Sequence, residues 1–277
     1  MPIFMWWFTI SSLLFFFGAV TGSFLNVLIE RSIEERNWIR GRSMCDLCGH
    51  KLAWYDNIPL LSFVFLKGRC RHCRKKIHPS HILMEVLTGV LFVWWFWGGF
   101  VVLNVFRLVH QPFRLVQPLF WLVVAILLLA IVIYDLRYLV IPDWTLWLLL
   151  SLTLLYRVML VAGGVMQAGD LVKSLVAAAL AAGFLSLLWL VTLGKGMGLG
   201  DVKLVIPLSL LVGWRLVVLG VVGAFMIGAV FSLVLLFFGR LKWQRPVPFG
   251  PYLVVSFLAT LVFGDLFLNW YLSWFML

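Results

Sequence analysis

Long apolar stretches separated by short polar segments run through the whole chain. Eight of them are expected to form helices, near residues 4–29, 82–104, 119–140, 144–162, 171–193, 203–214, 216–238 and 250–275. Crossing a bilayer takes about 20 predominantly apolar residues. An isolated segment in lipid satisfies its backbone hydrogen bonds only as a helix. The pattern therefore predicts an all-α polytopic membrane protein with about eight transmembrane helices, the short sixth separated from the seventh at Gly213-Trp214-Arg215.

Composition supports this interpretation. Of the 277 residues, 64% are hydrophobic and 12% are charged, whereas a soluble domain has about 25% charged residues. No Lys or Arg precedes Arg31, so the first stretch lacks the basic start of a cleaved signal peptide. We expect an uncleaved first transmembrane helix over residues 1–29 with its N-terminus outside, a cytoplasmic domain over 30–81, and a transmembrane helix bundle over 82–277.

The basic residues predict the orientation. Eleven of the 22 Lys and Arg residues lie between Arg31 and Lys76, and basic loops stay in the cytoplasm. Threading eight helices from this segment puts 17 basic residues inside and five outside. Topology and the anionic lipid of the bilayer account for the net charge of +11. We therefore expect the lipid bilayer, and no nucleic acid, as the partner of the basic residues.

All four cysteines lie in the predicted cytoplasmic segment. They form two CxxC pairs, Cys45–Cys48 and Cys70–Cys73, with 21 residues between the pairs. Four thiolates on two tight turns suit a tetrahedral zinc ion, and they leave no open position for a substrate. The alternatives are two disulfides or a redox dithiol, and a cytoplasmic position disfavours stable disulfides. The pattern predicts a structural zinc site.

Four acidic residues come from separate predicted helices to the cytoplasmic boundary: Asp135, Asp143, Asp201 and Glu85. Acidic residues in or beside apolar segments are costly and usually functional. Each also has a simpler interpretation. Asp143 is expected to be the N-cap of the fourth helix, Glu85 could pair with a Lys or Arg of the loop, and Asp135 could pair with Arg137.

Alternating glycines precede Asp201, at positions 194, 196, 198 and 200. They could form a flexible linker, but their spacing favours a close approach of the backbone around the carboxylate. Two neighbouring aspartates can hydrolyse a peptide bond without a metal, because they share a proton and act as acid and base.

Gly18 and Gly22 in the first helix permit close packing against another helix.

The ordered set of motifs resembles the bacterial type IV prepilin peptidases, which are membrane aspartyl proteases of the GxGD type. The resemblance runs nearly from end to end. It is carried by Gly22-Ser-Phe-Leu-Asn26-Val, the double CxxC with Asn57-Ile-Pro-Leu-Leu-Ser62, Glu85-Val-Leu-Thr-Gly89, Asp135 with Ile141-Pro-Asp143, Gly198-Leu-Gly-Asp201-Val-Lys203, and Pro248-Phe-Gly-Pro-Tyr252. Small departures are Asp46 after Cys45 and the run His78-Pro-Ser-His81.

The resemblance implies a catalytic pair, Asp135 and Asp201, that cuts the leader from type IV prepilins or pseudopilins at the cytoplasmic face of the bacterial inner membrane. Supporting residues would be Gly198, Gly200, Lys203, Asp143 and Glu85. Members with the cysteine module often also methylate the new N-terminus with S-adenosylmethionine. A transporter or membrane redox protein with a zinc-binding loop is the alternative. No internal repeat of the kind found in transporters is evident, and a redox protein would place its cysteine pairs outside.

Overall fold

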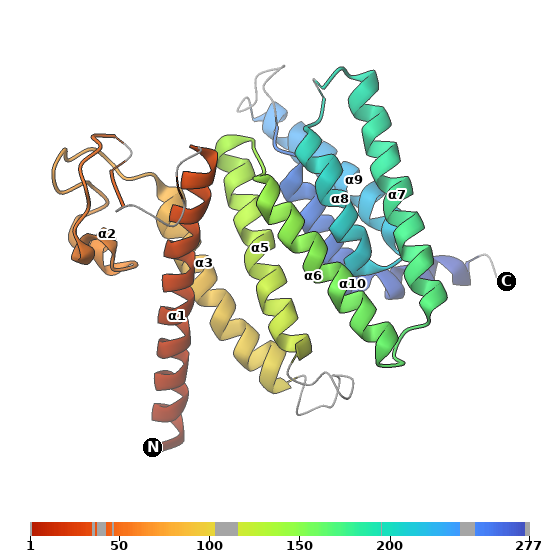
Figure 1. Ribbon diagram of the computed structural model, residues 1–277, viewed down its shortest axis with the longest axis horizontal. Coiled ribbons are helices and arrows are strands. Elements are labelled where there is room, and N and C mark those ends of the chain that lie inside the picture. The colour runs from red at the N-terminus through yellow and green to blue at the C-terminus, as the bar shows by residue number, and fades with distance from the viewer. Residues whose placement is uncertain are drawn as a thin grey trace. The chain divides into compact units, whose positions relative to one another are not determined.

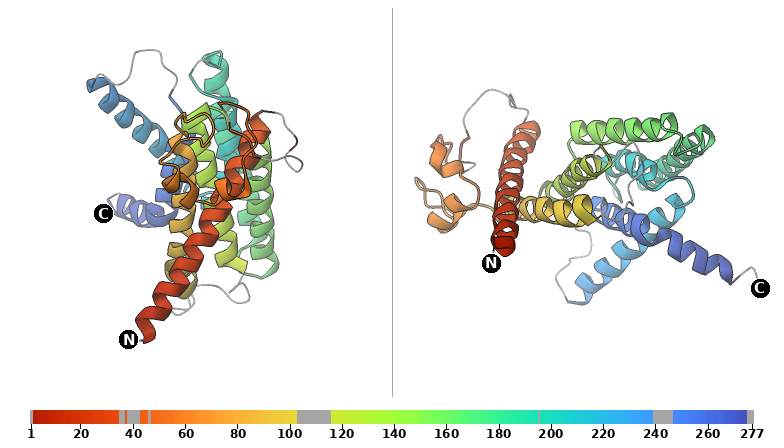
Figure 2. Two further views of the ribbon diagram at one scale, coloured as in Figure 1. Left: turned by 90° about the vertical axis from the view of Figure 1, so that its left-hand side faces the viewer. Right: turned by 90° about the horizontal axis from the view of Figure 1, so that it is seen from below.

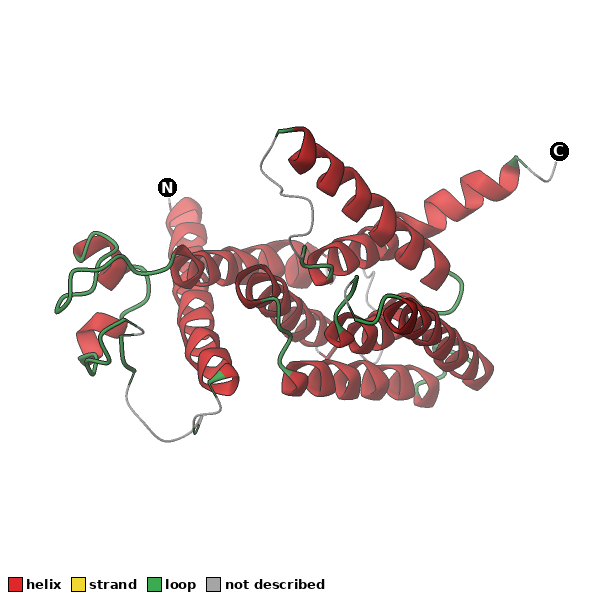
Figure 3. Cartoon of the chain, turned by 90° about the horizontal axis from the view of Figure 1, so that it is seen from above, coloured by secondary structure: helices red, strands yellow, loops and turns green. Residues whose placement is uncertain are grey.

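The computed structural model describes residues 2–34, 37, 43–45, 47–102, 116–194, 196–238 and 247–274. Over these residues the chain is helices and loops without a strand (Figures 1 and 3). This agrees with the predicted all-α class. The contacts divide the chain into two units, residues 1–133 and 134–277. The expected division at residues 29 and 81 stays a prediction.

Helices occupy all eight of the predicted stretches. Seven are long and apolar enough to cross a membrane. These are α1 (Pro2–Ile33), α3 (Pro79–Trp94) with its π-helical continuation η2 (Trp95–Val102), α5 (Val116–Tyr138), α6 (Asp143–Ala162), α7 (Ala168–Val191), α9 (Val217–Phe237) and α10 (Gly250–Ser273). The protein is therefore a polytopic membrane protein, as the apolar pattern predicts.

The predicted sixth helix is α8 (Leu199–Val212), and it differs from the prediction in one respect. Its 14 residues span about 21 Å, which is less than the hydrocarbon core of about 30 Å. It begins four residues before the predicted start at 203, so Asp201 lies in its first turn. The prediction placed these residues in the Gly-rich loop that precedes the helix. Here Gly198 is the N-cap and Gly200 is in the first turn, where glycine is tolerated.

In the first unit, α1 crosses α3 at glycines (Figures 1 and 2). A Cβ on Gly18 would lie 2.5 Å from the carbonyl oxygen of Thr88, and one on Gly22 would collide with the Thr88 hydroxyl. Gly89 of α3 meets Phe15 of α1 in the same way, at 2.7 Å. The close helix approach that Gly18 and Gly22 permit is thus made by α3, and any larger side chain there would force the two helices apart.

In the second unit, α8 is the buried element, in contact with α6, α7 and α10. Its apolar side chains Leu204, Leu208 and Leu210 are almost fully buried. Beside it, α9 and α10 cross (Figure 3), and the Ser256 hydroxyl donates a hydrogen bond of 2.7 Å to the carbonyl of Gly220. A short helix surrounded by longer ones can hold a polar side chain away from lipid, and Asp201 is such a side chain.

Candidate active site and metal centre

Asp135 lies in the last turn of α5, and its side chain is buried with 5% of the residue surface exposed. The backbone N–H of Gly250, the first residue of α10, donates a hydrogen bond of 3.1 Å to Asp135 Oδ2. The carboxylate comes from one end of the second unit's sequence and its donor from the other, so the site forms only when the unit folds. Helix N-termini present free N–H groups and favour a negative charge.

Asp201 is held in a similar way at the start of α8. It is buried, with 6% of its surface exposed. The N–H of Gly198 donates a hydrogen bond of 3.3 Å to Asp201 Oδ2, and the Asp201 N–H donates to the Gly198 carbonyl at 3.2 Å. Each of the two aspartates therefore has its Oδ2 fixed by a glycine N–H beside a helix start.

The two carboxylates converge on Gly250. A Cβ placed on this glycine would lie 2.6 Å from Asp135 Oδ2 and 3.5 Å from Asp201 Oδ1. Because both oxygens lie that close to one point, they are separated by at most the sum of these distances, about 6 Å. Two carboxylates at this separation and this burial cannot both ionise without a large electrostatic cost, so they favour a shared proton. The arrangement is suited to paired acid–base chemistry.

The four cysteines also come together. Their sulfur atoms all lie within 4.8 Å of one another, and Cys45 Sγ is 4.0 Å from Cys73 Sγ. Zinc–sulfur bonds of about 2.3 Å in a tetrahedron put sulfur atoms about 3.8 Å apart. The four sulfur atoms would need to move only slightly to bind one four-coordinate zinc ion. The four predicted ligands therefore lie close enough together to form one site.

The two CxxC turns share one geometry. Cys45 N–H donates to the His50 carbonyl and Gly49 N–H to the Cys45 carbonyl; Cys70 N–H and Arg74 N–H make the matching bonds to Lys75 and Cys70. Gly49 and Arg74 occupy the same position and both have positive φ, +68° and 55°. Two equivalent turns facing each other are typical of a zinc site built from paired knuckles.

The thiols of this cluster are not equivalent. Backbone hydrogen bonds from Cys73 and His72 lower the pKa of Cys70 to about 7. Desolvation by burial raises the pKa of Cys45 to about 11. Metal binding needs thiolates, so the lowered pKa of Cys70 favours its role as a ligand at neutral pH.

Comparison with known proteins identifies the family. Residues 16–98 match the bacterial peptidase A24 N-terminal domain, and residues 122–233 match the type IV leader peptidase family. The prepilin leader peptidase/N-methyltransferase of Aeromonas salmonicida (strain A449) is 32% identical over 95% of this chain and 94% of its own. The protein of the same name from Aeromonas hydrophila is 31% identical, over 95% and 93%. That from Pseudomonas aeruginosa is 30% identical, over 92% and 91%. The chain belongs to the type IV leader peptidase family. No solved structure matches this chain significantly.

Membership of the type IV leader peptidase family, together with the seven apolar helices, makes this an inner-membrane protein. The two matched regions contain different candidate residues. The N-terminal match contains the four cysteines and Glu85, and the leader peptidase match contains Asp135 and Asp201. Gly250, which contacts the aspartate pair, lies beyond the second match.

Glu85 binds a backbone group of the loop. Its Oε2 accepts a hydrogen bond of 2.9 Å from the N–H of Leu60, and the side chain also bonds to Ser23 of α1. Leu60 has a φ of 62° and a ψ of −48° at the centre of a γ-turn, in which the Leu61 N–H donates to the Pro59 carbonyl at 2.6 Å. A γ-turn with positive φ is rare and strained. Glu85 therefore holds a strained turn of the loop against α3. Glu85 thus bonds to the backbone of the loop, at Leu60, and this contact favours a role as an anchor of the loop.

The prediction that Asp143 is an N-cap is wrong. The N-cap of α6 is Pro142, and Asp143 is the first helical residue with no capping hydrogen bond. Its Oδ1 instead accepts a 2.6 Å bond from Nζ of Lys203 on α8. Both side chains are exposed, at 62% and 48%, so the pair contributes at most about 1 kcal/mol. The Asp143 carboxylate bonds to Lys203 and not to an N–H of its own helix, because the early start of α8 places Lys203 opposite α6.

The GxGD glycines have different surroundings. A Cβ on Gly200 would be 3.3 Å from Ile141, so the backbone of α8 lies tightly against the loop before α6. A Cβ on Gly198 would meet Asp201 Oδ2 at an ordinary 3.5 Å. The predicted approach of the backbone to the carboxylate is made by the Gly198 N–H, at 3.3 Å, whereas the tight contact of Gly200 is with Ile141. Gly250 lies in the motif Pro248-Phe-Gly-Pro-Tyr252, but it was not predicted from the sequence as a site residue. A glycine followed by proline at a helix start was the signal that could have identified it.

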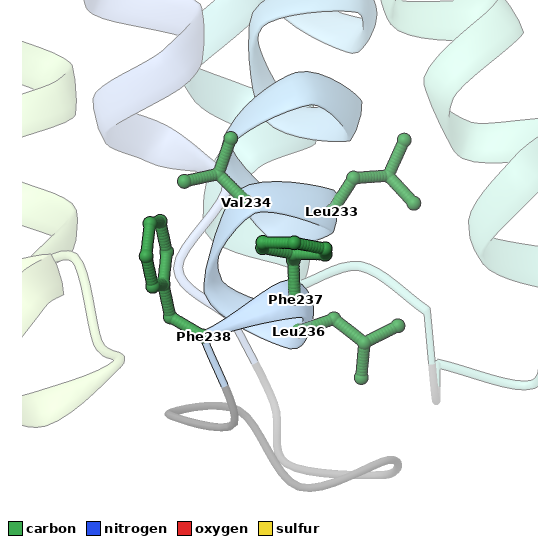
Figure 4. A pocket seen from close by; sticks show the side chains of 5 residues that line it. All are labelled: Leu233, Val234, Leu236, Phe237 and Phe238. Carbon is green, nitrogen blue, oxygen red and sulfur yellow. The ribbon is translucent and has the colours of Figure 1, made fainter.

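The described residues also form one open apolar pocket, at the C-terminal end of α9 (Figure 4). It is lined by Leu233, Val234, Leu236, Phe237 and Phe238. None of these side chains can donate or accept a proton. The pocket therefore offers no acid–base chemistry, and the aspartate pair is the better candidate for the reaction.

Proposed function

We propose that this protein is the membrane aspartyl endopeptidase that removes the leader from type IV prepilins or pseudopilins, with Asp135 and Asp201 as its catalytic pair. The observation that carries this proposal is the convergence of two buried carboxylates, from the end of α5 and the start of α8, within about 6 Å of each other. The names of the relatives, prepilin leader peptidase/N-methyltransferase, supply the substrate class.

The two carboxylates would divide the proton transfers. One takes a proton from an attacking water molecule while the other gives a proton to the scissile carbonyl oxygen, after which the roles reverse for the leaving amine. The Gly198 and Gly250 amides hold one oxygen of each carboxylate. This leaves the Oδ1 atoms for substrate and water. Burial excludes bulk water and strengthens each electrostatic interaction in the site.

We place the active site at the cytoplasmic face. The support is the cluster of eleven Lys and Arg residues between Arg31 and Lys76, which the positive-inside rule keeps in the cytoplasm. By the same topology, the ends of α5 and α8 that bear Asp135 and Asp201 face the cytoplasm. A prepilin would enter with its apolar helix in the bilayer and its leader at the aspartates.

We assign one structural zinc ion to Cys45, Cys48, Cys70 and Cys73. Four thiolates fill a tetrahedral shell, so the ion would stabilise the loop without binding the substrate. The relatives' names also support N-methylation of the new N-terminus, with S-adenosylmethionine as the methyl donor. Mass spectrometry of pilin treated with enzyme and this cofactor tests the second activity, through a product heavier by one methyl group.

The peptidase assignment is tested with Asp135→Asn and Asp201→Asn. Asparagine keeps the shape of aspartate but cannot carry the shared proton. Each variant should insert, bind prepilin and cleave it at least about 1,000-fold more slowly than wild type, and the double variant should be no worse, because groups acting as a unit are not additive. The measurement is the fraction of prepilin shortened by purified protein in liposomes.

Asp170→Asn is the matched control. Asp170 also lies in the first turn of a helix of the same unit, α7, where it pairs with Lys173 at 3.5 Å on the exposed surface. It should cleave at the wild-type rate. Near-normal cleavage by Asp201→Asn would show that the pair is wrongly assigned.

A further inference from the structure

The first turn of α10 has one backbone donor directed at the aspartate pair. Of its first four residues, Pro251 has no N–H, while the N–H groups of Tyr252 and Leu253 both donate to the Phe249 carbonyl at 3.1 Å. The N–H of Gly250 alone reaches Asp135, at 3.1 Å. The proline thus leaves a single amide, and a single hydrogen bond, to determine where Asp135 Oδ2 lies.

Space, and not backbone conformation, requires glycine at this position. Gly250 is buried and its φ lies outside the left-handed region. A Cβ here would nevertheless lie 2.6 Å from Asp135 Oδ2, which is closer than Cβ atoms approach other atoms in proteins. The same Cβ would lie 3.5 Å from Asp201 Oδ1. It would therefore take up space beside both carboxylates.

We propose that Gly250 is the positioning residue of the aspartate pair: its N–H fixes Asp135 Oδ2, and its missing side chain keeps the space beside the two carboxylates open for the reacting atoms. This inference rests on the proposed function, because it concerns the geometry of the proposed catalytic pair. It gives the Pro248-Phe-Gly-Pro-Tyr252 motif a direct part in the reaction, although the motif carries no titratable group that faces the pair.

Alanine at position 250 would have a specific effect. The Asp135 carboxylate would have to retreat by at least 0.4 Å to bring its contact with the new Cβ to 3.0 Å. A rotation of the carboxylate would achieve this retreat, and it would move Oδ2 away from the amide that now holds it at 3.1 Å. Misplacement of a reacting group on the scale of 1 Å costs about 100-fold in rate.

The first experiment compares Gly250→Ala with Gly220→Ala in full-length protein in liposomes with prepilin. Gly220 is a matched control because a Cβ there would meet Phe257 of α10 at 2.9 Å, which crowds the same helix without touching a carboxylate. Gly250→Ala should lower kcat about 100-fold with KM unchanged, whereas Gly220→Ala should keep kcat within about threefold. An equal loss in both variants would overturn the inference in favour of simple packing.

The pH profile provides a readout that a structural defect would not change. A sample that is only partly folded loses kcat by the same factor at every pH. A displaced carboxylate changes the pH at which kcat is half-maximal, because the coupling between the two aspartates changes. An unchanged profile in Gly250→Ala would contradict the positioning role.

The second experiment does not depend on folding of the Gly250→Ala variant. Hydrogen exchange of the segment Phe249–Leu253 is measured by mass spectrometry in Asp135→Ala and Asp201→Ala. Because the Gly250 amide loses its acceptor only in Asp135→Ala, that variant should exchange one additional amide rapidly and Asp201→Ala should not. The same uptake in both variants would refute the hydrogen bond.

These outcomes separate the two proposals. Absence of prepilin cleavage by the wild-type protein would remove the proposed function. Cleavage by wild type together with wild-type kcat in Gly250→Ala would remove only the positioning role of Gly250.

Discussion

Replacing Arg157 with methionine is expected to loosen α8 at the end opposite Asp201. Arg157 lies on α6 and reaches the C-terminal end of α8. Its Nε donates a 2.6 Å hydrogen bond to the Leu210 carbonyl, and Nη2 donates one of 3.1 Å to the Leu211 carbonyl. Helix carbonyls at this end lack partners within the helix, and a cation there complements the helix dipole. Methionine fills similar space but removes both donors and the charge.

The magnitude follows from these two bonds. A hydrogen bond to a charged group contributes about 1.5–3 kcal/mol, so two give at least about 3 kcal/mol. Polar contacts between membrane helices average only about 0.6 kcal/mol each, because the unfolded chain in lipid also finds partners. The expected destabilisation therefore lies between about 1 and 3 kcal/mol. The lower value would still be a large part of the stability of an ordinary domain.

The assay is thermal unfolding in detergent, followed by the fluorescence of the 15 tryptophans. Arg157→Lys, which keeps the charge but not the forked donors, should fall between wild type and Arg157→Met. Arg215→Met is the matched control, because Arg215 is an exposed cation in the adjoining turn and lies over the Trp214 ring at 5.3 Å. If Arg157→Met unfolds no earlier than Arg215→Met, the carbonyl contacts do not stabilise α8 and the reasoning fails.

Two further predictions concern the first unit. Cys70→Ser should lose bound zinc, measured by elemental analysis of purified protein, and should loosen residues 43–77. Most prepilin cleavage should remain, because both aspartates lie on other segments. Complete loss of cleavage in well-folded protein would contradict this separation. Glu85→Ala should shorten the half-life of residues 54–65 under limited proteolysis, because the Leu60 N–H loses its acceptor at a cost of about 1–3 kcal/mol. Glu85→Gln keeps an acceptor oxygen, so its segment 54–65 should survive longer. Equal half-lives for the two variants would show that Glu85 does not anchor the loop.

The sequence predicted most of the fold because lipid imposes a simple rule. A span must be apolar and helical, and each of the seven long helices lies close to its predicted position. The start of α8 could not be predicted in this way. It depends on Gly198 and Asp201 capping each other and on Gly200 fitting against Ile141. These are contacts, and hydropathy does not report contacts.

The sequence likewise predicted some residues of the site but not the contacts that hold them. The four cysteines and the pair Asp135 and Asp201 were recognisable as residues, because thiolates at CxxC spacing and carboxylates at the ends of apolar spans are chemically conspicuous. Their partners were not. The Gly250 amide is 115 residues from Asp135 in sequence, and a backbone N–H has no signature in composition. Asp143 was misread for a related reason: its nearest sequence context suggested a cap, whereas its partner, Lys203, comes from another helix.

The buried aspartates also explain why the second unit contains so short a helix. A carboxylate at the middle of a full-length span would lie deep in the hydrocarbon, where a charge is most costly. A 14-residue helix ends short of one boundary or the other. The first turn of α8 can then hold Asp201 near the membrane edge, while Arg157 supplies at the far end the donors that the missing turns would have provided. The two ends of the short helix are thus completed differently: Gly198 and Asp201 cap the start from within the segment, and Arg157 of α6 binds the carbonyls at the end.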